Sequence, residues 1–422
     1  MTQPLSNRAR AARLMAESGI EAVVACSPAS VRYLTGYWCW LAPLFKHYMV
    51  APGGSDDLVV RNVALLPHQG PECLIVEPYW ALDARESWVE DVRLAGGASF
   101  APATAAGELP DDLAGVAAAL AAAGPGDLIT TLAAALSDRG LTRARIGIER
   151  GAFRHEELVE LARLLPNVEL LDCTSLLRIV RAVKTAPEIA LLAEAAEIAE
   201  RAALAAFAEA GEGVTVSALA RAFRARSAAD GADFDHFAVS IRGLGFLCES
   251  ERRLAAGSAL YVDFGCIYRG WFSDSGTTLC VGEPSAGALA DFAAVRDAVS
   301  AGAAAMAPGV RGSAVQAAMQ AALAERGVGS GDSYPHGHGV GLEVRDYPVL
   351  TPDSGAVIGD DCVELSADLA LEPGMVVNLE APVLRLGERS VHCERTFVVT
   401  EDGCRGLIAQ DRNAPVVLGG RA

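Results

Sequence analysis

The sequence has no apolar run long enough to span a bilayer, and its start, MTQPLSNRARAARLM, lacks the apolar core of a signal peptide. Basic residues are in the minority, with 35 Lys and Arg against 53 Asp and Glu and a net charge of −18. This balance argues against a surface for nucleic acid or anionic membrane. The ten cysteines include no CxxC pair, which indicates free thiols and predicts a cytoplasmic protein.

The length and composition of the sequence are those of an ordinary globular protein. Its 422 residues, 51% hydrophobic and 21% charged, are enough for two domains that each have a core. In residues 1–175 short apolar strands alternate with helical stretches, which predicts an α/β domain. Residues 176–186 are the expected linker, and residues 187–422 combine long helices with long hairpins, which predicts an α+β domain.

The first domain carries no evident chemistry. It contains no phosphate-binding loop and no His or Cys clustered with acids. Its aromatic stretch 37–45 is interpreted first as domain core, and second as a binding-site rim offered to a partner subunit.

The second domain is organised around a hairpin, YVDFGCIYRGWFSDSGTTLCV, that starts at Tyr261. If its centre lies between Tyr268 and Arg269, Asp263 and Asp274 are directly opposed, with Cβ atoms about 5 Å apart. Two opposed carboxylates weaken a sheet unless a cation lies between them. The hairpin therefore favours a cation site.

A second hairpin repeats this arrangement downstream. MVVNLE and SVHCERTFVV flank a turn around Gly387, so Glu380 and Glu394 are also predicted to be opposed. One such pair alone could equally be structural, whereas two pairs carry a charge of −4 that two divalent cations would balance. We interpret the two hairpins as a two-metal site.

Between the hairpins lies a loop, YPHGHGVGLEV, that holds two of the seven histidines of the chain, His336 and His338. A lone histidine is more often a structural hydrogen-bonding group than a ligand. Here the glycines allow close backbone approach, and an imidazole supplies the nitrogen that a carboxylate site lacks, so a ligand role is favoured. One imidazole and four carboxylates suit Mn, Fe, Co or Zn.

These motifs resemble the methionine aminopeptidase/prolidase/creatinase superfamily, in particular its creatinase/prolidase branch. VDFGCIYRGWFSDSGTT matches the family's Asp-x-Gly hairpin, HGHGVGLEV its metal-binding His loop, and GMVVNLEAPV and CERTFVVTEDG its two Glu segments. The resemblance covers the whole chain in outline and is specific in the second half. It implies a pita-bread fold for the second domain.

The resemblance also implies roles for individual residues. The ligands of two divalent ions, with manganese favoured over iron, cobalt or zinc, would be Asp263, Asp274, His338, Glu380 and Glu394. Asp274 and Glu394 would bridge the ions, and Glu380 would relay a proton from a metal-bridging hydroxide. The family further implies a homodimer.

Four positions depart from the peptidase pattern or lie beside it. Phe246 and Arg345 stand where the peptidases have histidines, and His392 stands where they often have Arg. Arg345 can stabilise an oxyanion or bind a substrate carboxylate, or it forms a salt bridge to Asp346 or another acid. His392 is either an acid/base group or a hydrogen-bonding neighbour of a ligand. His236 and Phe246 are predicted to line the substrate site.

Three functions therefore compete. The first is a dinuclear-metal hydrolase that acts on a C–N bond of a small molecule or dipeptide, related to X-Pro dipeptidase and aminopeptidase P. The second is a non-peptidase catalyst on the same ligands, a lyase or a hydrolase of a cyclic amidine such as ectoine. A silent binding homologue ranks last, because the sequence keeps all five ligands. A metal-free, creatinase-like activity is also disfavoured.

Overall fold

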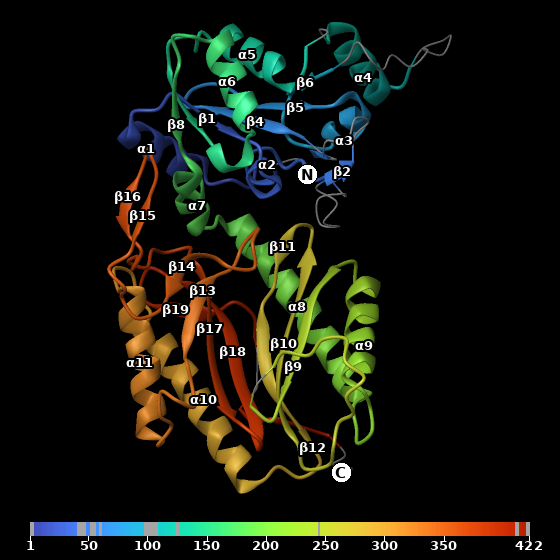
Figure 1. Ribbon diagram of the computed structural model, residues 1–422, viewed down its shortest axis with the longest axis vertical. Coiled ribbons are helices and arrows are strands. Elements are labelled where there is room, and N and C mark those ends of the chain that lie inside the picture. The colour runs from blue at the N-terminus through green and yellow to red at the C-terminus, as the bar shows by residue number, and fades with distance from the viewer. Residues whose placement is uncertain are drawn as a thin grey trace. The chain divides into compact units, whose positions relative to one another are not determined.

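The chain forms two compact units in a computed structural model, which describes residues 4–39, 48–50, 56–58, 61–96, 109–123, 126–243, 245–409 and 413–418 (Figure 1). Unit 1 comprises Met1–Val180 and Ile358–Glu364, and unit 2 comprises Arg181–Val357 and Leu365–Ala422. The boundary after residue 180 falls inside the expected linker 176–186. Most of the aromatic stretch 37–45, from residue 40 onward, lies outside the described residues.

Unit 1 is built on a six-stranded mixed sheet with the strand order β6-β5-β4-β1-β7-β8. Strands and helices alternate along the chain, so the predicted α/β architecture is confirmed. The elements are α1 (Arg8–Ser18), β1 (Ala22–Ala25), α2 (Pro28–Thr35), β2 (Tyr48–Val50), β3 (Asp56–Leu58), β4 (Val63–Pro67), β5 (Cys73–Val76), α3 (Ala81–Ala84), β6 (Asp91–Leu94), α4 (Asp111–Ala122), α5 (Leu128–Asp138), β7 (Arg145–Ile148), α6 (His155–Leu164), β8 (Glu169–Asp172) and α7 (Thr174–Ala182).

A segment from far along the chain completes unit 1. It is Ile358–Glu364, which runs from β15 (Val357–Gly359) to β16 (Glu364–Ser366), inside the range 187–422 expected to form the second domain. The Asp360 carboxylate accepts hydrogen bonds from the backbone N–H groups of Ser175 (2.6 Å) and Leu176 (2.9 Å). These are free donors of the first turn of α7, so Asp360 stabilises that helix in the manner of an N-cap.

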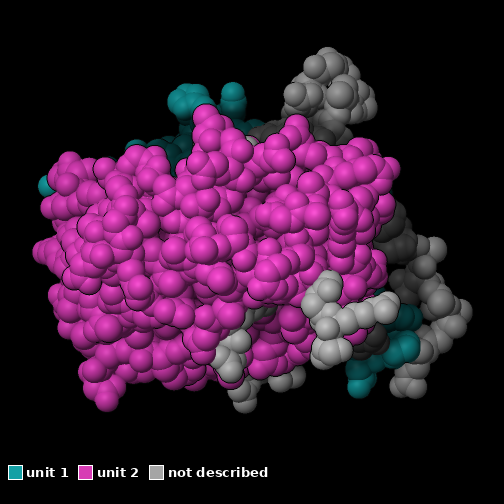
Figure 2. Space-filling view, turned by 90° about the horizontal axis from the view of Figure 1, so that it is seen from below, with its two compact units in different colours: residues 1–180, 358–364 teal, residues 181–357, 365–422 magenta. Residues whose placement is uncertain are grey.

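Unit 2 holds a ten-stranded sheet in which β11-β10-β12-β18-β17-β13-β14 are consecutive neighbours and β9 pairs with β10. In the view of Figure 2 the unit forms one continuous packed surface. Its further elements are α8 (Ala186–Ala208), α9 (Val216–Ala229), β9 (Asp233–Ile241), β10 (Ala259–Tyr268), β11 (Trp271–Phe272), β12 (Ser275–Val281), α10 (Ala286–Ala305), α11 (Gly312–Glu325), β13 (His336–Gly339), β14 (Asp346–Leu350), β17 (Val376–Arg385), β18 (Arg389–Val399), β19 (Cys404–Gly406) and β20 (Val416–Leu418).

Two pairs of helices cover one face of this sheet. Phe264 of β10 packs into a core with α8 and α9, and Leu379 of β17 packs into a core with α10 and α11 (Figure 1). Successive residues of a strand point to opposite faces. Asp263 and Glu380, the neighbours of these two core residues, therefore face away from the helices.

The first hairpin turns one residue later than the sequence analysis predicts. Its turn is Arg269–Gly270, with φ of 49° and 88°, as in the type I′ turns that suit twisted hairpins. Asp263 consequently pairs with Gly276, and the predicted direct opposition of Asp263 and Asp274 is wrong. A register shift of two residues keeps every side chain on its face, so Asp274 remains on the side of Asp263.

The second hairpin turns at Gly387, where φ is 85°, as predicted. Its register pairs Glu380 directly with Glu394, which confirms the expected opposition. No helix among the described residues is long and apolar enough to cross a membrane.

Candidate metal centre

One row of residues crosses five strands on the face of the sheet opposite the helices. Directly paired residues of neighbouring strands place their side chains on the same face. The recorded pairs run from β10 through β12, β18 and β17 to β13 as Asp263, Gly276, Glu394, Glu380 and His336. Three of the four predicted carboxylate ligands therefore lie in line.

A second row lies two residues further along the same strands. It contains His236, which pairs with Gly265 across β9 and β10, and His338, which pairs with Asn378 across β13 and β17. Asp274 lies between them, just before β12 begins, and its backbone carbonyl accepts hydrogen bonds from Asn378 Nδ2 (3.1 Å) and Thr396 Oγ1 (3.0 Å). These two bonds hold the first hairpin against the second.

Side-chain distances join the two rows. The His338 ring, 1% exposed, places Nε2 at 3.3 Å from Asp274 Oδ2 and 3.9 Å from Glu380 Oε1. Its Nδ1 donates to the backbone carbonyl of Gly339 at 3.0 Å, which leaves Nε2 with its lone pair directed at the acids. The five predicted ligands thus gather in one place, with Asp274, Glu380 and Glu394 buried.

His236 lies inside this cluster rather than at its rim. Its Nε2 is 2.8 Å from Asp263 Oδ1 and 3.5 Å from Asp274 Oδ1, and its Nδ1 is 2.8 Å from Asp235 Oδ2. Burial alone would lower the pKa of this imidazole, but its hydrogen bonds to the acids, Asp235 first, hold the pKa well above the usual range.

His392 is the innermost histidine of the site and is fully buried. Its Nε2 is 2.9 Å from Glu394 Oε2, and Tyr261 stacks on its ring with centroids 3.8 Å apart. Burial lowers the pKa of His392. Among the described residues its Nδ1 has no hydrogen-bond partner. The geometry places His392 against a predicted ligand and away from solvent.

Tyr261 links His392 to the surface. Its hydroxyl donates to Asp263 Oδ2 at 3.1 Å, and its ring meets Phe246 edge-on at a centroid distance of 5.3 Å. The Phe246 side chain is 63% exposed. The structure therefore places Phe246 at the outer end of an aromatic column that leads to Glu394.

Arg345 reaches the site from the other side. Its Nη2 donates to Glu380 Oε1 at 3.2 Å and lies 2.9 Å from His336 Nε2. The alternative prediction is a salt bridge to Asp346 or another acid. Asp346 faces the buried Lys184 amine at 3.5 Å instead, whereas the salt bridge to another acid is formed, with Glu380. Glu380 is thus held by two side chains, since His336 Nε2 is also 2.6 Å from its Oε1.

The buried carboxyl groups of the site differ in how well their neighbours stabilise the charged form. Burial raises the pKa of Glu394 well above its usual range, and the negative charges of Asp274 and Asp263 add to the effect. For Asp274 burial acts in the same direction, but hydrogen bonds with His236 and His338 outweigh it and hold the pKa below its usual range. Glu394 is therefore a carboxyl group of the site whose charged form is strongly disfavoured without a cation.

The strand between the two acids leaves room for them. A Cβ added to Gly276 would lie 2.5 Å from Glu394 Oε2 and 2.2 Å from His392 Cδ2. Any side chain at Gly276 would therefore displace both groups. The glycine makes the space into which Glu394 and His392 project.

The donors fit divalent metal ions. Three groups have donor atoms within 4.8 Å of one another, namely His236 with Asp263 and Asp274, Asp274 with His338 and Glu394, and Glu380 with His392 and Glu394. Carboxylate oxygens and imidazole nitrogens are ligands of Mn, Fe, Co and Zn. A divalent ion would also remove the cost of burying Glu394 beside other acids.

Sequence reasoning missed His336 and Tyr261 as members of the site. The sequence contains the information needed to find both residues. His336 is two residues before His338, and Tyr261 is two residues before Asp263, so each shares a face of its strand with a predicted ligand. Asn378, two residues before Glu380, is found by the same rule.

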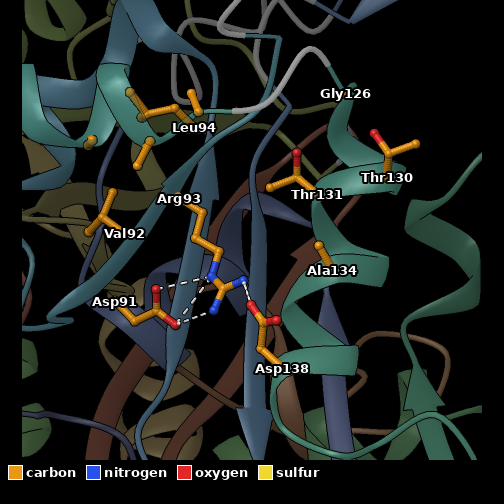
Figure 3. A pocket seen from close by; sticks show the side chains of 12 residues that line it. Asp91, Val92, Arg93, Leu94, Gly126, Thr130, Thr131, Ala134 and Asp138 are labelled. Atoms are coloured by element: carbon orange, nitrogen blue, oxygen red, sulfur yellow. Dashed lines mark hydrogen bonds and ion pairs between the residues drawn. The ribbon is translucent and has the colours of Figure 1, made fainter.

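A cavity in unit 1 is a separate feature. It has a volume of about 590 Å³ and lies between β6, α4 and α5 (Figure 3). Arg93 in its wall contacts Asp138 at 2.6 Å and Asp91 at 3.1 Å, so two carboxylates neutralise the guanidinium. None of the residues that line it belongs to the predicted site.

Comparison with known sequences agrees with this arrangement. Residues 190–401 match metallopeptidase family M24, and residues 8–183 match the creatinase/prolidase N-terminal domain. The uncharacterized peptidase YqhT of Bacillus subtilis is 28% identical over 287 residues, which are 67% of this chain and 77% of that protein. The probable dipeptidase PepE of Mycobacterium tuberculosis is 34% identical over 155 residues, 36% of this chain and 38% of that protein.

Solved structures share the fold over nearly the full chain. An Xaa-Pro dipeptidase from Bacillus anthracis superposes with a TM-score of 0.72 at 21% identity and covers 97% of this chain and 99% of its own. An X-Pro aminopeptidase from Thermotoga maritima gives 0.71 at 20% identity, with 98% and 99% covered. The expected architecture, an α/β first domain and a pita-bread second domain, is confirmed. The chain belongs to metallopeptidase family M24, in its creatinase/prolidase branch, and is a metal-dependent hydrolase.

Proposed function

We propose that this protein is a dinuclear-metal hydrolase that cleaves a C–N bond, amide or peptide-like, in a small molecule or dipeptide. The ions would be held by Asp263, Asp274, His338, Glu380 and Glu394. The observation that carries the proposal is the sharing of donors. Asp274 and Glu394 each belong to two of the three donor groups found among the described residues, as bridging ligands of two ions would.

Divalent ions, when bound, acidify water and polarise a carbonyl oxygen, which is the chemistry that amide hydrolysis requires. The chain's own groups complete the site. Glu380 is proposed to accept the proton of the attacking water, because His336 and Arg345 both hold its Oε1 in a fixed position. His392 keeps Glu394 oriented from a fully buried position, so we assign it a positioning role.

Substrate binding is assigned to Arg345 and Phe246, the two positions that depart from the peptidase pattern. The Arg345 side chain is 58% exposed although its Nη2 contacts Glu380, so its remaining N–H groups can meet a substrate carboxylate or a developing oxyanion. Phe246 offers an exposed apolar ring to the same substrate. Small dipeptides and amino-acid derivatives with a free carboxylate satisfy both contacts.

A second candidate is a non-peptidase reaction on the same ligands, either a lyase reaction or hydrolysis of a cyclic amidine such as ectoine. It is favoured by the same two departures, since a guanidinium and a phenyl ring replace two histidines of the peptidases. In this case Glu380 would still handle the proton.

We also infer that the protein is cytoplasmic and acts as a homodimer. None of the ten cysteines forms a disulfide, and several of them lie deep in the core, which suits a reducing compartment. The dimer rests on membership of the creatinase/prolidase branch, and sedimentation analysis of the purified protein tests it.

Metal analysis followed by a substrate screen tests the function. We expect about two divalent ions per chain, loss of activity with a chelator, and hydrolysis of an X-Pro dipeptide or a related amide. The screen includes creatine, ectoine-type cyclic amidines and sulfonium compounds. Bound metal with turnover of a sulfonium compound and of no amide would select the lyase, and a protein without metal affinity would refute both candidates.

A further inference from the structure

His236 extends a nitrogen into the acid cluster from β9, a strand that supplies none of the five predicted ligands. Its Nε2 faces two carboxylate oxygens, Asp263 Oδ1 at 2.8 Å and Asp274 Oδ1 at 3.5 Å. On the other side of the ring, Nδ1 is 2.8 Å from Asp235 Oδ2. The imidazole therefore contacts one acid through Nδ1 and two acids through Nε2.

This arrangement is the one that metal-bound histidines adopt. A ligating histidine donates its second ring N–H to a carboxylate, which fixes the tautomer and leaves the other nitrogen free to bind the ion. Asp235 occupies the place of that carboxylate. With the proton on Nδ1, the lone pair of Nε2 faces the lone pairs of two carboxylates, and a cation between them turns repulsion into attraction.

The neighbouring strand leaves room for the ring. Gly265 pairs with His236 across β9 and β10, and a Cβ at Gly265 would lie 2.6 Å from His236 Cε1. Together with Asp263 and Asp274, His236 forms a group of donors within 4.8 Å, which shares only Asp274 with the group that contains His338.

We propose that His236 is a sixth ligand of the metal centre, binding through Nε2 the ion that Asp263 holds, and that Asp235 is its positioning residue. The inference rests on the proposed dinuclear centre and replaces the prediction that His236 binds substrate. It gives each ion one imidazole, from His236 on one side and His338 on the other. Imidazole ligands favour Fe, Co and Zn over Mn, so the metal preference shifts away from manganese.

The test counts nitrogen ligands directly. The wild-type protein, His236→Gln and His338→Gln are loaded with cobalt(II), and X-ray absorption reports the imidazole scattering per ion while calorimetry reports the two dissociation constants. His155→Gln is the matched control, because His155 begins α6 and belongs to none of the three donor groups. We expect His236→Gln to lose about half of the imidazole scattering and to weaken one dissociation constant by at least about tenfold.

The outcomes separate this inference from the proposed function. If His338→Gln weakens cobalt binding and His236→Gln matches the control, the dinuclear centre stands and the sixth ligand is refuted. If wild type binds fewer than two ions and His338→Gln changes nothing, the proposed function fails as well. Retained imidazole scattering in His236→Gln would also refute the proposal.

A second variant keeps the test decisive if His236→Gln does not fold, which far-ultraviolet circular dichroism of the metal-free protein would reveal. Asp235→Asn removes the carboxylate that orients the ring but keeps its size. We expect it to weaken the same dissociation constant by about tenfold, within the range for outer-shell partners of metal ligands. Cobalt affinity equal to that of His155→Gln would overturn the role of His236.

Discussion

The two acid-bearing hairpins of unit 2 differ in how regular they are. The β17–β18 hairpin keeps one unbroken register of ten pairs, from Val376 opposite Val398 to Arg385 opposite Arg389. The β10–β12 hairpin is interrupted, because its return strand is divided into β11 and β12 with Asp274 between them. Both nevertheless deliver their acids to the same face of the sheet.

The interruption explains how four acids can converge. Asp274 lies in the gap between β11 and β12, and its backbone carbonyl accepts hydrogen bonds from Asn378 and Thr396 of the other hairpin. The regular hairpin thus serves as the frame, and the irregular one is fastened to it at the metal site. Substitutions within the regular hairpin and substitutions of the groups that bond the irregular hairpin to it should therefore have different effects.

The largest effect is expected from the residues shared between donor groups. Asp274→Ala and Glu394→Ala should each lose both ions and activity together, because a bridging ligand serves both ions. We expect activity to fall by well over the roughly 100-fold typical of changes next to a ligand. Metal analysis and turnover measure it, with the exposed Glu388→Gln, in the hairpin of Glu394, as the control. Full metal occupancy in either variant would contradict the bridging roles.

Gly276→Ala should come next, because it adds one methyl group between the hairpins. Its Cβ would meet His392 and Glu394 at 2.2 and 2.5 Å. Overpacking of this kind typically costs about 1–3 kcal/mol of unfolding free energy. We expect that loss in urea unfolding of the metal-free protein, and weakened metal binding by calorimetry. A variant with wild-type metal affinity would show that the two side chains can move aside.

Arg345→Ala tests the exposed side of the site, where Arg345 contacts Glu380 of the regular hairpin. Removing a cationic group aimed at developing charge typically costs about 100-fold in turnover. We expect kcat/KM to fall by up to that factor while metal content stays at the wild-type level, since Arg345 is not a ligand. Arg345→Lys should recover little, because lysine lacks the guanidinium fork. An unchanged rate would reduce Arg345 to a structural partner of Glu380.

Asn378→Ala removes one of the two bonds that fasten the hairpins. Thr396 still donates to the Asp274 carbonyl, so the fold should persist. We expect metal affinity to weaken by about tenfold, as for other groups that orient a ligand. Calorimetry with cobalt(II) measures it, and Thr396→Val should have a similar effect. If both variants bind metal as wild type does, the fastening does not position Asp274.

Much of this arrangement could be predicted from sequence, because side chains alternate along a strand. The spacing alone placed Glu380 opposite Glu394, and an error in the first hairpin's register still left Asp263 and Asp274 on one face. The position of His236 could not be predicted in this way. Its pairing with Gly265 depends on the register between β9 and β10, which a long connection joins, and no short turn fixes that register.

The smallest effect is expected at the turn of the regular hairpin. Gly387 has φ of 85° and nothing within 4 Å of an added Cβ, so Gly387→Ala adds strain but no clash. A left-handed backbone costs a non-glycine residue about 1–2 kcal/mol. We expect urea unfolding to show a loss of that size, with metal affinity and turnover unchanged. Gly276→Ala is the complementary variant, because there the backbone is unstrained but the added Cβ is crowded. If Gly387→Ala also weakened metal binding, strain at the turn would reach the metal site, and the β17–β18 ladder would not be rigid.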